Sequence, residues 1–69
     1  MTLEEAKVLA QQGVKMTHEY FCDYEWLIIM NGNLITFEDG VQIFVNEWVE
    51  NKEYLLYGWF KFNNKKIKL

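Results

Sequence analysis

The spacing of apolar side chains in the first part of the chain is that of a helix. Between residues 3 and 12 these side chains recur every three or four positions, which places them on one helix face. They are Leu3, Ala6, Leu9 and Ala10. Thr2 and Glu5 stand at capping-box spacing, and Gly13 stands where a left-handed C-terminal cap is needed. We therefore predict a helix from Leu3 to Gln12, which is too short to persist alone in water and must pack on the rest of the chain.

After this helix the pattern changes to that of β-strands. Apolar and polar residues alternate from 14 to 18, and residues 24–30 form a dense run of strand-forming side chains. Asn31-Gly32 then predicts a two-residue hairpin, because both residues tolerate a positive φ. Residues 34–37 are the expected return strand.

A second turn and a less regular segment complete the pattern. Glu38-Asp39-Gly40 predicts a tight turn, and residues 41–44 alternate again as a further strand. We expect Asn46 to cap a short helical turn, and residues 53–62 to form a further turn or a last strand.

This order of elements predicts a single small α+β domain over residues 1–69, with the N-terminal helix packed on one face of an antiparallel β-meander. The polar and basic end, residues 63–69, is expected to be frayed.

The chain is so short that one core gives it little stability, and additional support is expected. A domain of this size buries about 60% of the surface of its unfolded chain, and one such core supplies roughly 3–5 kcal/mol. Cys22 is the only cysteine, so no intramolecular disulfide can form, and one Cys with one His falls short of a structural zinc site. Self-association is the remaining support that we expect. The lone thiol also favours a reducing cytosol, and no segment has the length of a membrane span.

Charge and residue usage disfavour several functions. The net charge is −3 and the chain has no arginine, which opposes general nucleic-acid binding. Serine is also absent, as is a glycine-rich phosphate loop, and the carboxylates follow no metal-loop pattern. We therefore expect no catalytic residue, no metal and no cofactor.

His18 is the one residue whose neighbours could suggest catalysis. It lies close in sequence to Cys22, but in an extended strand the two would be about 13 Å apart, at roughly 3.3 Å per residue. We therefore expect His18 to lie at the surface beside a loop.

Aromatic side chains make up 17% of the chain, which is more than so small a core readily hides. Some must lie near the surface, where aromatic patches are typical of interfaces and ligand grooves. For Trp26 and for Tyr54-Leu55-Leu56, burial in the core or in a subunit interface is as good an interpretation as a binding surface.

Three segments together resemble a known family. Leu3-Glu4-Glu5-Ala6 through Gly13 matches an opening helix of the EEA type, and residues 14–21 match a strand that ends at an aromatic residue. Residues 53–59, EYLLYGW, match a closing DLLAxDW segment. The chain thus resembles the second type of phage-encoded Thoeris anti-defence proteins, which sequester cyclic nucleotides. Phe21 stands where that family has Trp, Thr17-His18 where it has a basic pair, and Gly58 where it has Asp.

The resemblance implies a homo-oligomer, such as a tetramer, in the host bacterial cytosol. Pockets between its subunits would hold a nucleotide messenger, such as a cyclic ADP-ribose isomer or a cyclic oligonucleotide, without cleaving it. Phe21, Trp48 and Trp59 would then supply stacking surfaces. Phosphate or ribose contacts would come from Lys15, Thr17 and His18, and Tyr57 completes the expected ligand-binding set.

We consider two leading function hypotheses and two further interpretations. The first is sequestration of a nucleotide immune messenger. The alternative is a protein inhibitor that binds a host defence enzyme, such as a CRISPR or restriction component, through the aromatic patch. A purely structural oligomer is a third interpretation, and an enzyme is a fourth.

Overall fold

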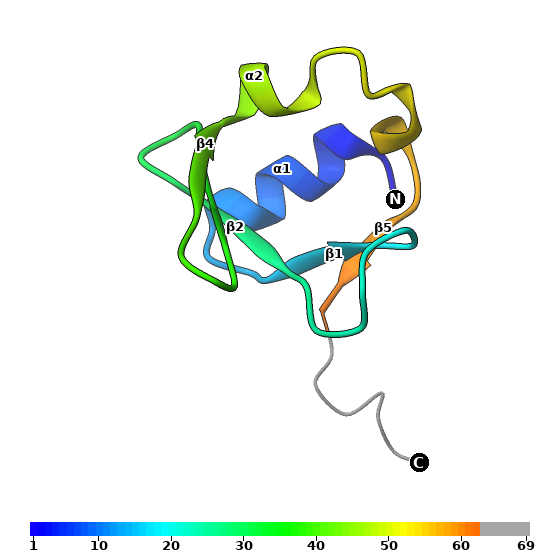
Figure 1. Ribbon diagram of the computed structural model, residues 1–69, viewed down its shortest axis with the longest axis horizontal. Coiled ribbons are helices and arrows are strands. Elements are labelled where there is room, and N and C mark those ends of the chain that lie inside the picture. The colour runs from blue at the N-terminus through cyan, green and yellow to red at the C-terminus, as the bar shows by residue number, and fades with distance from the viewer. Residues whose placement is uncertain (63–69) are drawn as a thin grey trace.

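A computed structural model describes residues 1–62 and shows an N-terminal helix packed on a five-stranded antiparallel sheet (Figure 1). The elements in chain order are α1 (Leu3–Gln11), β1 (Met16–His18), β2 (Leu27–Met30), β3 (Leu34–Phe37), β4 (Gln42–Phe44), α2 (Val45–Val49), the 3₁₀ turn η1 (Glu53–Leu56) and β5 (Trp59–Lys61). The strand order across the sheet is β4-β3-β2-β1-β5. The predicted α+β class is confirmed, whereas the prediction for residues 63–69 lies outside the described residues.

Local sequence signals define α1 at both ends. The backbone N–H of Glu5 donates to the Thr2 hydroxyl at 3.2 Å, and the N–H of Thr2 donates to the Glu5 carboxylate at 2.9 Å, which confirms the capping box. At the other end Gly13 has a φ of +91°, and its N–H donates to the Ala10 carbonyl. The helix ends at Gln11, one residue before the predicted end.

The first hairpin is present, but its loop differs from the prediction. Met30 pairs with Leu34, so the loop holds three residues rather than two. Asn31 and Gly32 both have positive φ, as predicted. Asn33 is the extra residue, and its carbonyl accepts the N–H of Val45 at 2.9 Å. A contact with a distant segment therefore holds the longer loop.

The second turn follows the prediction closely. Gly40 has a φ of +89° and donates its N–H to the Phe37 carbonyl at 2.9 Å. The Asp39 carboxylate accepts the N–H of Val41 at 3.1 Å. This turn therefore comes from residue types that favour it locally.

Two predicted boundaries are wrong. Residues 24–26 belong to a loop before β2, because hydrogen bonds from Phe21 N–H to His18 O and from Glu25 N–H to Cys22 O turn the chain there. Asn46 lies inside α2 and does not cap it; the cap position is Phe44, with no side-chain hydrogen bond. Because the Val45 N–H already has the Asn33 carbonyl as its partner, the helix begins directly after the strand.

The sheet has two unlike faces. Side chains of cross-strand partners share a face, so the register places Ile29, Ile35 and Ile43 together. This row points to the core with Leu27, and α1 packs against the same side. The opposite face of β2, β3 and β4 carries two rows of three residues. They are Ile28, Thr36 and Gln42, followed by Met30, Leu34 and Phe44.

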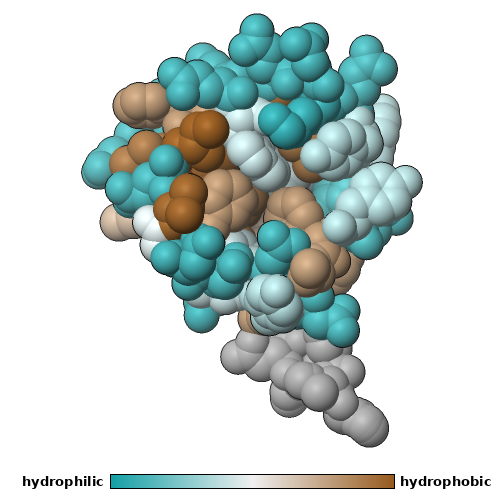
Figure 2. Space-filling model, in the orientation of Figure 1, coloured by the Kyte–Doolittle hydropathy of each residue, from teal (hydrophilic) through white to brown (hydrophobic). Residues whose placement is uncertain are grey.

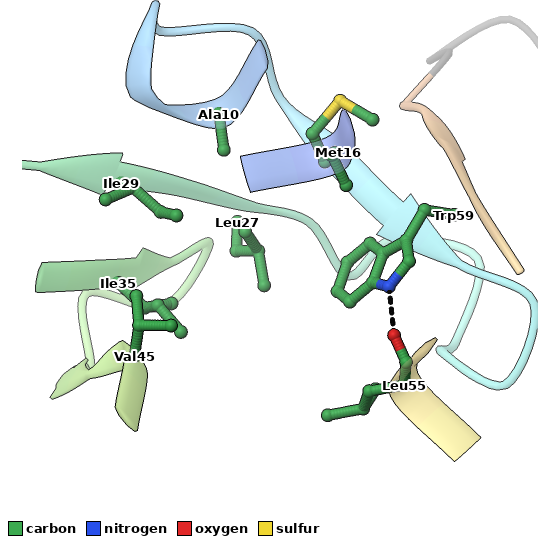
Figure 3. Close-up of a cluster of buried hydrophobic side chains, with 9 residues drawn as sticks. Ala10, Met16, Leu27, Ile29, Ile35, Val45, Leu55 and Trp59 are labelled. Atoms are coloured by element: carbon green, nitrogen blue, oxygen red, sulfur yellow. Dashed lines mark hydrogen bonds between the residues drawn. The ribbon is translucent and has the colours of Figure 1, made fainter. Parts of the chain in front are cut away.

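The core lies between α1 and the sheet. Ala6 and Ala10 are 3% and 1% exposed, and their small side chains let the helix backbone approach the strands. Figure 3 shows the buried cluster beneath them. Its other members are Met16, Leu27, Ile29, Ile35, Val45, Leu55 and Trp59. Across residues 1–62, no helix is both long and apolar enough to cross a membrane.

Candidate functional site

Three aromatic rings that the resemblance assigns to stacking lie together. The ring centroids of Phe21 and Trp48 are 6.2 Å apart, those of Phe21 and Trp59 are 5.7 Å apart, and those of Trp48 and Trp59 are 6.2 Å apart. All three pairs meet edge to face, a favourable arrangement for aromatic rings. Residues distant in sequence thus form one aromatic cluster.

Trp59 is the buried member of this cluster. Its side chain is 3% exposed, and its indole N–H donates to the Leu55 carbonyl at 2.6 Å (Figure 3). In the single chain Trp59 therefore belongs to the core. Only Phe21 and Trp48, which are partly buried, carry the cluster to the surface.

His18 is buried, which corrects the prediction of a surface histidine. It is 1% exposed, and its Nδ1 atom accepts the backbone N–H of Tyr20 at 3.1 Å. Since that N–H can only donate, the ring proton lies on Nε2, which donates to the carbonyls of Tyr57 at 2.6 Å and Tyr54 at 3.1 Å. The strand position was read correctly, but the sequence did not reveal the later segment that covers it.

The predicted phosphate contacts do not meet in one place. Thr17 and His18 are neighbours in β1, so their side chains point to opposite faces of the sheet. Lys15 is exposed, with its Nζ atom 4.4 Å from the centre of the Trp26 ring. His18 already uses both ring nitrogens within the chain.

Tyr57 lies at a different hollow. Its side chain is 69% exposed and borders a shallow depression of about 250 Å³. The other lining residues are Thr2, Leu3, Glu4 and Leu56. The structure thus places Tyr57 apart from Phe21 and Trp48.

An open cleft begins where the aromatic cluster reaches the surface. Its volume is about 340 Å³, and it lies between the loop before β2, the turn between β3 and β4, and α2. Phe37 adds a third ring, 5.4 Å from that of Trp48. We call this hollow the aromatic cleft. Its lining residues are Phe21, Glu25, Phe37, Glu38, Asp39, Val41 and Trp48.

Three carboxylates border the aromatic cleft, and backbone hydrogen bonds orient each of them. Glu25 accepts from the N–H of Cys22 at 2.6 Å, and Glu38 accepts from that of Trp26 at 3.3 Å. Asp39 accepts from Val41 in the turn. Each of these bonds uses one carboxylate oxygen. Within residues 1–62, no second hydrogen bond and no ion pair engages these carboxylates.

The cleft is therefore acidic, but its described carboxylates are not grouped as metal ligands. Among the described residues, no group of three or more His, Cys, Asp or Glu side chains is placed to hold a metal ion. The carboxylates are spread along the border of the cleft. They create a negative surface beside aromatic rings.

Cys22 and Tyr24 lie in the loop that leads to the cleft. The pKa of the Tyr24 hydroxyl is raised above its usual value of 10.0, chiefly by the charge of Cys22 and next by a hydrogen bond with that side chain. Both residues are exposed. The effect is local, and neither residue lines the cleft.

Sequence reasoning missed much of this site. The sequence predicts Glu25, Phe37 and Val41 only as strand residues. It predicts Glu38 and Asp39 only as turn residues. A usable signal was the closeness of acidic residues to aromatic ones at residues 21–26 and 37–39. Only the fold brings these two segments together beside Trp48 of α2.

The space beneath α1 offers no alternative pocket. Its internal volume is about 10 Å³, roughly that of one water probe. It is lined by core residues such as Ala6, Ile29 and Val45. A ligand of the single chain would therefore bind at the surface.

Comparisons of the chain with protein-family models, curated proteins and solved structures found no match. The fold and the site define a small α+β protein with an acidic aromatic cleft.

Proposed function

We propose that this chain acts by binding rather than by catalysis, and that the aromatic cleft is its contact surface for another protein. The observation that carries the proposal is the lining of the cleft. Three rings lie in an open hollow beside polar groups, and aromatic anchors with a polar rim are typical of protein interfaces. A specific form of this function is the alternative hypothesis given above, a protein inhibitor that binds a host defence enzyme.

The charge of the cleft supports a protein partner over a nucleotide. A nucleotide brings phosphates, and the three carboxylates beside the rings would repel them. The residues expected to attract phosphate are dispersed: Lys15 lies beside Trp26, Thr17 and His18 are buried, and Thr17 and His18 point to opposite faces.

Sequestration of a nucleotide messenger is the second candidate. The meeting of Phe21, Trp48 and Trp59 in one cluster favours it, since aromatic rings stack on bases. The carboxylates could accept hydrogen bonds from ribose hydroxyls or base amino groups. In this arrangement the base would enter the cleft and the phosphates would face solvent.

Site-directed photo-cross-linking tests the contact surface. A benzophenone amino acid replaces Val41, which borders the cleft, or Val8, which lies on the outer side of α1; the two are 55% and 53% exposed. In cells that naturally contain this protein, we expect one adduct of defined mass from position 41 and none from position 8. The cross-linked protein, once purified, should bind the wild-type chain and bind Val41→Lys at least about ten-fold more weakly.

Equal adducts at both positions, or none at either, would contradict the proposal. Isothermal calorimetry with cyclic nucleotides and cyclic ADP-ribose isomers then tests the second candidate. If one of these nucleotides gives saturable heat with the wild-type chain, and a folded Trp48→Leu variant gives none, nucleotide sequestration replaces the protein-contact proposal.

A further inference from the structure

We propose that the aromatic cleft receives a basic side chain, lysine or arginine, from the partner protein. This inference rests on the proposed function and adds the chemistry that the cleft recognises. The charged head would lie among Glu25, Glu38 and Asp39 and against the ring of Trp48.

The first step of the argument is the unused capacity of the carboxylates. Each of the three spends one oxygen on a backbone N–H, which fixes its direction and leaves the second oxygen for a ligand. A cation that meets such oriented carboxylates forms charge-assisted hydrogen bonds, which are stronger than neutral ones. The three carboxylates are therefore oriented to accept hydrogen bonds from a positively charged donor.

The second step is that no described lysine fills this role. Residues 1–62 contain ten acidic side chains and four lysines, a formal charge of −6 with His neutral. Lys7 pairs with Glu4, Lys15 lies on Trp26, and Lys52 donates to the Trp48 carbonyl. Lys61 is exposed in β5 and forms no ion pair within this range. Within residues 1–62, no lysine therefore pairs with the carboxylates of the cleft.

The third step is the aromatic wall. A cation over a Trp ring is attracted by the negative ring face. The chain itself contains this contact, since the Lys15 ammonium lies 4.4 Å from the centre of the Trp26 ring. Trp48 offers a second indole beside three carboxylates, so attraction of the same kind would be reinforced by charge.

The fourth step is size. The cleft volume of about 340 Å³ is at the lower end of the roughly 300–1,000 Å³ range of ligand pockets. It suits one or two side chains rather than a folded loop. A short basic segment that inserts a single lysine or arginine is the occupant that fits both the volume and the charge.

The test uses the full chain labelled with 5-fluorotryptophan and titrated with hexaarginine or hexalysine at low salt. Three fluorine signals are expected, from Trp26, Trp48 and Trp59. We expect the Trp48 signal to shift saturably and the signal of the buried Trp59 to stay in place. The binding should weaken as salt is raised.

Two triple variants distinguish the effect of the cleft carboxylates on binding from the effect of net charge. Glu25→Gln, Glu38→Gln and Asp39→Asn together keep an oxygen acceptor for each backbone N–H, and should weaken binding about ten-fold. The matched control changes Glu4, Glu50 and Glu53 to Gln, none of which lines the cleft, and alters net charge equally. The control should bind hexaarginine within about two-fold of wild type.

Several results would overturn the inference. These are saturation by hexaglutamate, equal loss in both triple variants, and a shift at Trp26 with none at Trp48. If the wild-type chain self-associates and only the cleft triple variant fails to do so, the lysine comes from a second copy of the chain. That result would overturn the assignment to a foreign partner. If hexaarginine fails while cross-linking at position 41 succeeds, the basic side chain is wrong and the proposed function stands. If both fail, the proposed function fails too.

Discussion

At the scale of single residues, Gly58 explains how the chain connects its buried histidine to its last strand. It has a φ of +95°, and its carbonyl accepts the N–H of Glu19 at 3.0 Å. A Cβ atom there would lie 2.7 Å from the Glu19 carboxylate and 3.0 Å from the His18 ring. A side chain at position 58 is therefore opposed both by the backbone angle and by these contacts.

Gly58→Ala should lower the free energy of unfolding by about 2 kcal/mol, because both the backbone angle and the close contacts oppose a side chain. Gly40→Ala is the control, since it also has a positive φ but no atom within 4 Å of the added Cβ. We expect about 1 kcal/mol there. Urea unfolding followed by tryptophan fluorescence measures both, and equal losses would contradict the role of the contacts.

At the scale of elements, α1 depends on its first turn and on the sheet beneath it. The helix has nine residues, which is too few for stability in isolation. Its capping box satisfies backbone N–H groups that would otherwise lack partners, and Ala6 and Ala10 hold it on β2 and β1. The cap therefore supports the whole core.

Thr2→Ala should cost about 1 kcal/mol of unfolding free energy, because the Glu5 N–H loses its hydroxyl partner. Thr2→Ser keeps that partner and should stay close to wild type. Urea unfolding followed by far-ultraviolet circular dichroism provides the comparison. A Thr2→Ala protein as stable as Thr2→Ser would show that the capping bond contributes nothing.

At the scale of the whole molecule, charge is unevenly distributed over the surface. The outer rows of β2, β3 and β4 contain no ionisable side chain, although residues 1–62 carry ten acidic groups. Met30 and Phe44 on this face are 44% and 51% exposed. On the side of the molecule that Figure 2 shows, apolar side chains reach the surface between polar ones. Two acidic copies could approach each other here with little repulsion.

If self-association supports this small core, the outer sheet face is where we expect it. Sedimentation equilibrium at increasing concentration should then show species larger than one chain. Phe44→Lys should shift the equilibrium to monomer, because it places like charges at the interface. Val8→Lys, at a site of similar exposure on α1, should leave it unchanged. A wild-type chain that is monomeric at every concentration would contradict the prediction.

The sequence alone determined the features that depend on near neighbours. The ends of α1, the turn at Glu38–Gly40 and the strand at Leu34–Phe37 follow from residue types a few positions apart, because capping and turn hydrogen bonds form within that distance. Only the tertiary structure decided the three-residue loop, the direct start of α2 and the burial of His18. Each depends on a backbone partner that is distant in sequence. The aromatic cleft belongs to the second kind, because three separated segments must fold together before its rings and carboxylates share one surface.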